Sequence, residues 1–179
     1  MRMVALTDRK WAIGKGGDLL VRIPKDHQLF LQETLGCHVV MGRKTFESLP
    51  GKQPLYGRIN VVLSKDPSFS PKGVMICRSM EEVLKRLAEV PRDRICVIGG
   101  ESIYRQFLPY CSTADITAVD YVYDGDRFFP DLDRDPEWKL AAESEEETYF
   151  DLAFTFRQYK RIAGGKKAYA ANQLRIKGE

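Results

Sequence analysis

Two short apolar runs in this chain each end at a glycine and lead directly into a helical segment. This repeated unit constrains the fold more than any other feature. The first run is Val-Val-Met-Gly at residues 39–42, before Arg-Lys-Thr at residues 43–45. The second is Ile-Cys-Val-Ile-Gly-Gly at residues 95–100, before a helical pattern at residues 101–108. Buried-type strands that alternate with helices are typical of a mostly parallel sheet covered by helices on both faces.

The other predicted elements fit around this framework. Short apolar runs predict strands at residues 1–6, 59–64, 74–77 and 116–119, and residues 137–160 alternate like a β-ribbon. Pro24 suits the first position of a helix whose apolar face is Leu29, Phe30 and Leu35. A capping box at residues 79–82 opens another helix, and residues 7–23 are expected to form a long glycine-containing loop. We therefore predict one α/β domain, with a central, mostly parallel mixed sheet, an antiparallel C-terminal edge and flanking helices.

Composition restricts the class of protein. With 179 residues, 44% of them hydrophobic, the chain suits one globular domain with a real core. No apolar run approaches membrane-spanning length and no secretory signal precedes the first strand, so a cytoplasmic protein without a membrane partner is expected. Residues 157–179 hold seven basic residues and one acidic residue, which leaves 21 basic and 24 acidic residues in the body. This mildly acidic body argues against a nucleic-acid surface.

The cysteines and histidines give no sign of a metal site. The four cysteines, at positions 37, 77, 96 and 111, lack paired metal-ligand spacing, and three lie in or beside apolar runs. They are expected to be small core residues in a reducing compartment. With only two histidines in the chain, a histidine-rich metal site is not expected.

The two glycine corners are candidate phosphate and cofactor sites. A helix N-terminus offers unpaired backbone N–H groups, Gly42 allows close approach, and Arg43, Lys44 and Thr45 add charge and a hydroxyl. The paired glycines at 99–100 would let a pyrophosphate or a ring lie against the backbone, although they do not form a G-x-G-x-x-G fingerprint. Ordinary strand-to-helix turns with solvated basic residues are the alternative. Two such corners in one small domain favour a dinucleotide lying across the strand ends.

Three further side chains are candidates for substrate chemistry. Asp26 lies in the first turn after Pro24, where the helix dipole would lower its pKa and apolar neighbours would raise it. Arg58 opens a strand and could bind a carboxylate through two parallel hydrogen bonds. Thr117 lies inside a strand. Each also has an ordinary explanation. Asp26 could merely complement the helix dipole, Arg58 could be a solvated arginine at a strand edge, and Thr117 could simply be a good strand former.

Taken in order, these features resemble one known family. Residues 1–161 resemble bacterial dihydrofolate reductases, and the order and spacing of the shared motifs are highly specific although each motif alone is weak. The motifs are Ile13-Gly14, Ile-Pro-Lys-Asp at 23–26, Gly-Arg-Lys-Thr at 42–45, Pro-Leu-Tyr-Gly-Arg-Ile-Asn at 54–60, Val-Ile-Gly-Gly at 97–100, Tyr-Arg-Gln-Phe at 104–107, Gly125-Asp126 and Phe129-Pro130.

The resemblance implies that a hydride from NADPH reaches C6 of 7,8-dihydrofolate while N5 gains a proton, which gives 5,6,7,8-tetrahydrofolate. Asp26 would bind the 2-amino group and N3 of the pterin, and Thr117 would share this hydrogen-bond network. Arg58 would hold the α-carboxylate of the glutamate tail. Antifolate inhibitors such as trimethoprim would occupy the same cleft. The remaining substrate-lining residues would be Val4, Ala5, Leu6, Phe30, Leu49, Leu55 and Ile98.

The resemblance also implies where NADPH would bind. Residues 42–45 would hold the pyrophosphate, and Ser64 with Arg43 and Arg78 would face the adenosine 2′-phosphate and select NADPH over NADH. Gly99 and Gly100 would approach the cofactor, with Tyr104 near the nicotinamide. The other expected cofactor contacts are Leu6, Ile13, Leu63, Glu101, Ser102 and Ile103. A monomer is expected.

The chain departs from the family pattern at three places. Val21 stands where most members carry a tryptophan that helps to order water near the acid, and Leu20 replaces the usual proline. His27 stands where an aliphatic residue is common, and it either turns to solvent or borders the folate cleft. Residues 162–179 extend beyond the usual end of the fold, and Gly164-Gly165 marks the expected boundary of this basic extension.

Two other functions compete with this interpretation. A pteridine or pyrimidinone reductase of the riboflavin pathway shares the fold, but it would not need the acid at Asp26 or the arginine at Arg58. A non-catalytic nucleotide-binding protein would keep only the cofactor corners. Consumption of NADPH with and without dihydrofolate distinguishes the three.

Overall fold

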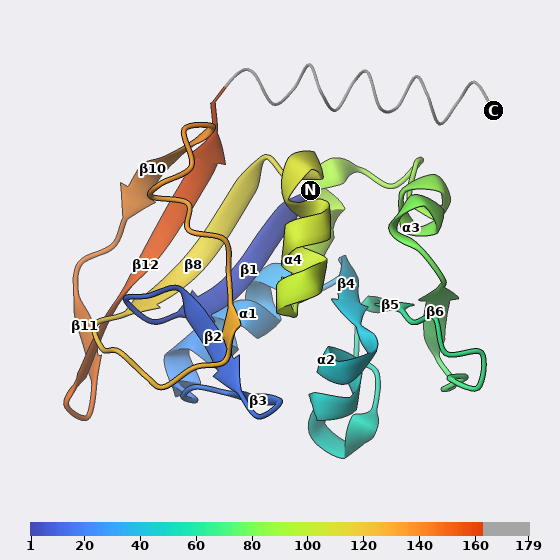
Figure 1. Ribbon diagram of the computed structural model, residues 1–179, viewed down its shortest axis with the longest axis horizontal. Coiled ribbons are helices and arrows are strands. Elements are labelled where there is room, and N and C mark those ends of the chain that lie inside the picture. The colour runs from blue at the N-terminus through green and yellow to red at the C-terminus, as the bar shows by residue number, and fades with distance from the viewer. Residues whose placement is uncertain (163–179) are drawn as a thin grey trace.

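The computed structural model, which describes residues 1–162, is built around a nine-stranded sheet with helices on both faces (Figure 1). Its main path runs β10-β12-β8-β1-β7-β4-β5-β6, and β11 pairs with β12. The parallel strands are β1 (Arg2–Thr7), β4 (His38–Gly42), β5 (Ile59–Leu63), β6 (Val74–Cys77), β7 (Ile95–Gly99) and β8 (Thr113–Val119). The antiparallel edge is formed by β10 (Trp138–Glu143), β11 (Glu147–Tyr149) and β12 (Leu152–Arg161). The predicted mixed sheet with an antiparallel C-terminal edge is confirmed.

The helices begin close to the predicted positions. They are α1 (Pro24–Thr34), α2 (Arg43–Ser48), α3 (Met80–Arg86) and α4 (Glu101–Phe107), with 3-10 turns at Pro50–Lys52, Arg92–Arg94 and Leu108–Tyr110. The Ser79 cap of this helix is confirmed, because Ser79 Oγ accepts a hydrogen bond of 3.1 Å from the backbone N–H of Glu82, while the Glu82 carboxylate accepts one of 2.6 Å from the N–H of Arg78 rather than of Ser79. The expected apolar face of α1 is wrong at one position. Leu35 lies beyond the end of α1 and is 59% exposed.

The expected loop at residues 7–23 instead contains a β-hairpin at residues 12–19. Strand β2 (Ala12–Lys15) pairs with β3 (Asp18–Leu19) and with β9 (Arg127–Phe128), which forms a second, small sheet. Gly16 and Gly17 have φ angles of +60° and +88°, so they form the two-residue turn that such a hairpin prefers. Sequence reasoning missed the hairpin because β2 and β3 are short and lack the alternating apolar pattern of a half-buried strand.

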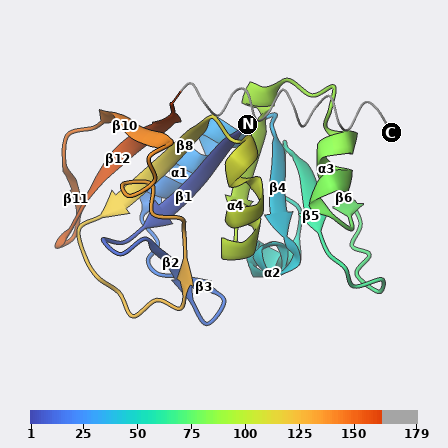
Figure 2. The same ribbon diagram turned by 45° about the horizontal axis from the view of Figure 1, so that its top comes forward.

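The sheet separates two layers of apolar side chains. On one side, α3 and α4 cover a core that includes Met3, Val40 and Val97. On the other side, Phe46 of α2 packs with Val39 and other strand residues. Figure 2 shows α4 lying across the sheet between β1 and β4, with α1 and α2 on the far side. The four cysteines are buried and unpaired, as expected for small core residues.

Several findings are confined to residues 1–162. None of the helices there is long and apolar enough to cross a membrane. The same stretch contains no group of three or more His, Cys, Asp or Glu side chains that could hold a metal ion. The expected boundary at Gly164-Gly165, and all of the proposed extension except Ile162, lie outside the described residues.

Candidate active site

The first turn of α1 and the middle of β8 bring Asp26 and Thr117 together. Pairing of β8 with β1 places Thr117 opposite Leu6. Helix α1 lies on the face of the sheet to which the Thr117 side chain points. Thr117 Oγ1 donates a hydrogen bond of 2.6 Å to Asp26 Oδ1, and the threonine is only 5% exposed. The buried Thr117 hydroxyl therefore bonds one carboxyl oxygen of Asp26, and the other oxygen, Oδ2, can accept hydrogen bonds from a ligand.

The environment of Asp26 decides between the two effects that the sequence left open. Burial raises the pKa of Asp26, while the Thr117 hydrogen bond and the nearby His27 act in the opposite direction without overcoming it. Asp26 therefore holds its proton at a higher pH than an ordinary aspartate. The His27 side chain is exposed and stacks over Phe30, a predicted cleft residue, at 6.4 Å between ring centroids.

The predicted substrate residues divide among neighbouring regions of the fold. A cavity of about 400 Å³ is lined by Val4, Asp26, Phe30 and Thr117, among others. Leu49, Leu55 and Ile98 pack together with the core around α2. Leu6 packs with Ile23, Val119 and Phe154, whereas Ala5 packs against the core on the opposite face. Strand alternation explains this split, because Val4 and Leu6 share one face of β1 and Ala5 points to the other.

Arg58 lies at the C-terminal end of α1. Its Nε donates a hydrogen bond of 2.9 Å to Thr34 Oγ1, and its two terminal nitrogens donate to the backbone carbonyls of Leu31 and Tyr56. The guanidinium is therefore fixed against the helix at the end opposite Asp26. A carboxylate that reached Arg58 would be about the length of α1 from Asp26, since a helix rises by about 1.5 Å per residue.

The two predicted glycine corners are neighbours in space. Strands β4 and β7 are adjacent and parallel, so both corners lie at the same end of the sheet. A Cβ on Gly42 would come within 3.2 Å of Ile103, and one on Gly100 within 3.7 Å of Thr45. Gly99 has a φ of +118°, which favours glycine, and its α-carbon faces the Tyr104 ring. Tyr104 is itself fixed by a hydrogen bond of 2.7 Å from its hydroxyl to the Val4 carbonyl.

The residues expected to face the adenosine 2′-phosphate also lie near one another. Arg78 donates hydrogen bonds to the carbonyls of Ser64 and Asp66, at 3.0 and 2.6 Å. Arg43 forms an ion pair of 3.3 Å with Glu47 in the next turn. Two guanidinium groups beside a hydroxyl fit the chemistry of a phosphate monoester. Leu63 precedes Ser64 at the end of β5, while Lys44 and Ser102 are exposed at the two corners.

Sequence reasoning missed Asp8, whose carboxylate organises the hairpin, and it assigned Glu101 to the cofactor rather than to this region. Asp8 is 4% exposed, and its carboxylate accepts hydrogen bonds from the backbone N–H groups of Lys10, Ala12 and Tyr123 at 2.8–2.9 Å. Glu101 accepts one from Phe128 at 2.8 Å. An aspartate directly after a strand could have been recognised as a turn residue, but its long-range bond to Tyr123 has no local signal. Ile13 packs against the core beneath α4.

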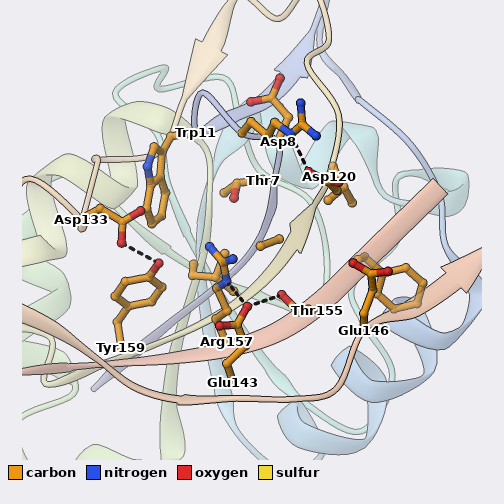
Figure 3. A pocket seen from close by; sticks show the side chains of 15 residues that line it. Thr7, Asp8, Trp11, Asp120, Asp133, Glu143, Glu146, Thr155, Arg157 and Tyr159 are labelled. Carbon is orange, nitrogen blue, oxygen red and sulfur yellow. Dashed lines mark hydrogen bonds and ion pairs between the residues drawn. The ribbon is translucent and has the colours of Figure 1, made fainter.

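A second cavity of about 260 Å³ lies over the antiparallel edge, on the face that carries Trp11 and Tyr159 (Figure 3). The Tyr159 hydroxyl donates a hydrogen bond of 2.9 Å to Asp133 there. No residue that the sequence predicted as a site lines this cavity. The candidate active site is therefore the cleft around Asp26.

Comparisons with known proteins agree with this geometry. A sequence model of the dihydrofolate reductase family matches residues 1–161. A dihydrofolate reductase of Neisseria gonorrhoeae is 37% identical over 158 residues, which covers 88% of this chain and 95% of the relative. One from Bacillus subtilis is 33% identical, with the same coverage of both chains. The structure of an Enterococcus faecalis dihydrofolate reductase, complexed with NADP(H) and the compound RAB-propyl, superposes with a TM-score of 0.79 at 29% identity. It covers 89% of this chain and 95% of that one.

Proposed function

The chain belongs to the dihydrofolate reductase family and catalyses the NADPH-dependent reduction of dihydrofolate to tetrahydrofolate; we propose that Asp26, Thr117 and Arg58 recognise the substrate. The observation that carries this assignment is the 2.6 Å hydrogen bond between Thr117 and Asp26 in a half-buried cleft. A carboxyl and a hydroxyl held side by side match the adjacent N–H groups of a 2-amino-4-oxopyrimidine ring.

Asp26 orients the pterin and favours protonation of its imine. Its free carboxylate oxygen accepts hydrogen bonds from the ring, and its negative charge stabilises the positive charge that develops at N5. Thr117 fixes the carboxyl orientation from the strand side. NADPH, when bound, supplies the hydride to C6. The protein contributes orientation, exclusion of water and electrostatics, since the hydride chemistry belongs to the cofactor.

The cofactor residues are assigned from the two corners. Residues 42–45 would hold the pyrophosphate, Gly99 and Gly100 would approach the cofactor, and Tyr104 would lie near the nicotinamide. Arg43, Ser64 and Arg78 would hold the 2′-phosphate. This is supported by the contacts that bring Arg78 onto the Ser64 carbonyl and by the adjacency of β4 and β7. Leu6, Ile13, Leu63 and residues 101–103 complete the expected cofactor contacts.

Arg58 is proposed as the clamp for the α-carboxylate of the glutamate tail. Leu49, Leu55, Phe30 and Ile98 form the apolar walls between the clamp and the pterin, with Val4 and Leu6 of β1 below the pterin. Ala5 can contribute only its backbone, because its side chain points to the opposite face. This is supported by the position of Arg58 at the far end of α1 from Asp26. Antifolates are expected to occupy the same cleft.

The assay that tests the function follows NADPH absorbance with purified protein. NADPH is expected to be consumed only when dihydrofolate is present, and Asp26→Asn is expected to reduce the rate strongly at neutral pH. Consumption with a pyrimidinone substrate, but not with dihydrofolate, would favour the riboflavin-type reductase. Cofactor binding without consumption of either substrate would favour a nucleotide-binding protein.

We further infer a cytoplasmic monomer with a basic extension after residue 161. The four unpaired cysteines support a reducing compartment. Light scattering on the purified chain tests the monomer. A chain truncated after Arg161 tests the boundary, because full activity of the truncated enzyme is expected.

A further inference from the structure

The β2–β3 hairpin belongs to a sheet of its own, so its position depends on the contacts that join this small sheet to the rest of the protein. Strand β9 forms one edge of the small sheet and pairs with β2. The N–H groups of Asp126 and Phe129, on either side of β9, donate to the carbonyls of Gly14 and Trp11 at 3.0 and 2.8 Å. Whatever holds β9 in place therefore also holds the hairpin.

Glu101 joins β9 to the main body of the protein. It is the first residue of α4 and follows directly after the glycine corner at residues 99–100. Its carboxylate accepts a hydrogen bond of 2.8 Å from the backbone N–H of Phe128 in β9. Among the hydrogen bonds within residues 1–162, this is the one that connects α4 with the small sheet. The Glu101 side chain is only 30% exposed, and a charged acceptor strengthens such a bond.

The same bond explains how a carboxylate is accommodated beside the expected cofactor. Gly99 and Gly100 are expected to approach NADPH, and a freely moving carboxylate at the next residue would repel its phosphates. The Glu101 carboxylate is instead held by Phe128, and Arg105 lies 4.0 Å from it in the next turn of α4. The backbone of Glu101 can therefore approach the cofactor while its side chain serves β9.

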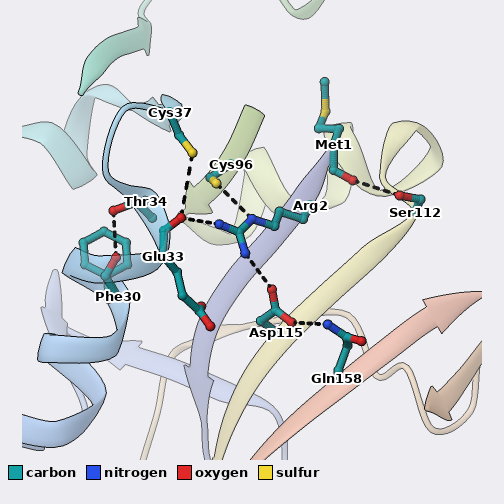
Figure 4. Close-up of polar contacts among 10 residues, drawn as sticks. All are labelled: Met1, Arg2, Phe30, Glu33, Thr34, Cys37, Cys96, Ser112, Asp115 and Gln158. Atoms are coloured by element: carbon teal, nitrogen blue, oxygen red, sulfur yellow. Dashed lines mark hydrogen bonds and ion pairs between the residues drawn. The ribbon is translucent and has the colours of Figure 1, made fainter. Parts of the chain in front are cut away.

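The polar network around Arg2 provides a contrast. Arg2 of β1 forms an ion pair of 3.3 Å with Asp115 of β8, which also accepts a hydrogen bond of 3.1 Å from Gln158 of β12 (Figure 4). These three strands are already joined by the backbone hydrogen bonds of the main sheet. Glu101 and Phe128, by comparison, connect two parts of the fold that share no strand pairing.

Apolar contacts next to this bond keep β9 near α4 without fixing the backbone of Phe128. Phe129 is 1% exposed, and its ring lies 4.6 Å from that of Tyr104 and 5.9 Å from that of Trp11 between centroids. Loss of the Glu101 bond is therefore expected to loosen β9 and the hairpin while α4 and the core remain folded.

We propose that Glu101 is a positioning residue for hydride transfer, because its carboxylate holds β9, and through β9 the hairpin, against the helix that follows the cofactor corner. Its side chain touches none of the reacting atoms. The inference rests on the proposed function, in which Ile13 of β2 and the corner at residues 99–100 both contact NADPH. A hairpin held in this position keeps Ile13 on the cofactor and helps to exclude water from the site. NADPH and the Glu101 bond then favour the same position of the hairpin.

The test compares Glu101→Ala with Glu101→Gln, which keeps a carbonyl oxygen as the acceptor. Exchange of the Phe128 amide hydrogen is followed by NMR in D₂O without ligands, and we expect it to be about two- to tenfold faster in Glu101→Ala, as for loss of one hydrogen bond. Hydride transfer in a single turnover should slow by a similar factor, and the Kd for NADPH should rise. The Kd for dihydrofolate, measured without NADPH, should stay at the wild-type value. Glu101→Gln should restore most of each change.

Glu81→Ala is the matched control, because Glu81 is exposed and also lies in the first turn of a helix, α3. It should leave amide exchange, NADPH binding and hydride transfer unchanged. An equal effect in Glu81→Ala, or unchanged Phe128 exchange in Glu101→Ala, would overturn the proposal. Weaker NADPH binding with unchanged exchange would mean that the Glu101 side chain contacts the cofactor directly, and faster exchange with normal hydride transfer would make the bond purely structural. Either result also overturns the proposal. Failure of the proposed function would appear differently, as a wild-type protein that does not reduce dihydrofolate, whatever the exchange at Phe128.

Discussion

Thr34 Oγ1 accepts a hydrogen bond of 2.9 Å from Arg58 Nε, and the same hydroxyl donates one of 2.7 Å to the carbonyl of Phe30. Thr34 is completely buried at the last position of α1. The arginine is therefore joined through Thr34 to a residue of the proposed substrate cleft. Its orientation is fixed before any ligand arrives, which reduces the entropy lost on binding.

Replacing Arg58 by leucine should weaken dihydrofolate binding far more than NADPH binding. Loss of a carboxylate clamp leaves the partner charge unpaired, which costs on the order of 2–5 kcal/mol in a buried contact. The KM for dihydrofolate and the Kd for NADPH, measured on the same preparation, check this. An equal loss for both ligands would show that Arg58 does not hold the tail. The melting temperature should also fall, because Leu31 and Tyr56 lose a hydrogen-bond donor.

Thr34→Val provides a milder version of the same perturbation. It keeps the Arg58 charge and nearly the same side-chain volume, but it removes the hydroxyl that orients the guanidinium. The KM for dihydrofolate is expected to rise less than in Arg58→Leu, with kcat little changed. If Thr34→Val raised KM as much as Arg58→Leu, the hydroxyl would have to contribute to binding beyond its contact with Arg58.

Local patterns in the sequence were sufficient to place α1 and most strands of the main sheet. Pro24 begins α1, and the runs before Gly42 and Gly100 are adjacent parallel strands. Long-range pairing was not accessible in this way. The contact of Asp8 with Tyr123 joins residues 115 positions apart, and the pairing of β2 with β9 has no local signal. The family resemblance supplied the roles of Asp26 and Thr117, which spacing alone does not distinguish from ordinary helix and strand residues.

Asp26→Asn should lose most activity at neutral pH while the folded protein becomes more stable. Burial raises the pKa of Asp26, so folding favours the neutral carboxyl. The preference of the folded state for neutral Asp26 contributes fully to the free energy of unfolding below the unfolded-state pKa. This contribution is lost as the pH rises through the higher folded-state pKa. An uncharged asparagine avoids that loss and can still accept the Thr117 hydrogen bond.

Thermal melts and rates across pH check both halves of this prediction. The melting temperature of Asp26→Asn should exceed that of the wild type at pH 7 and converge with it near pH 3. Activity should recover partly at low pH, where the substrate arrives already protonated. Near-normal turnover of the variant at neutral pH would remove Asp26 from the mechanism.

The enzyme should prefer NADPH over NADH, and Arg78 should contribute to that preference. Arg78 is held beside Ser64 by two hydrogen bonds to backbone carbonyls, and the charges of Arg43 and Arg78 both reach Asp66. Arg78→Gln should lower kcat/KM for NADPH and leave that for NADH nearly unchanged. Lys72→Gln, at an exposed position before β6, serves as the charge-matched control. Comparable kcat/KM with the two cofactors in the wild type would refute the assignment of this cluster.

The last prediction concerns Val21, at the end of the segment that contains the β2–β3 hairpin. Val21 is half-buried and packs with Leu6, Ile23, Val119 and Phe154, beside the strand residues of the cleft. Val21 cannot bind a water molecule, whereas the tryptophan usual in the family offers an indole N–H. We therefore expect closure of the hairpin segment to rely on aliphatic packing, and proton delivery to N5 to rely on a less ordered water.

Val21→Trp should change the pH profile of the hydride step, or inhibitor affinity, more than it changes NADPH affinity. Val21→Phe adds a ring without an N–H group, so it separates the effect of volume from that of the donor. If Val21→Trp alters only NADPH binding, or alters nothing while the fold stays intact, residue 21 does not face the pterin.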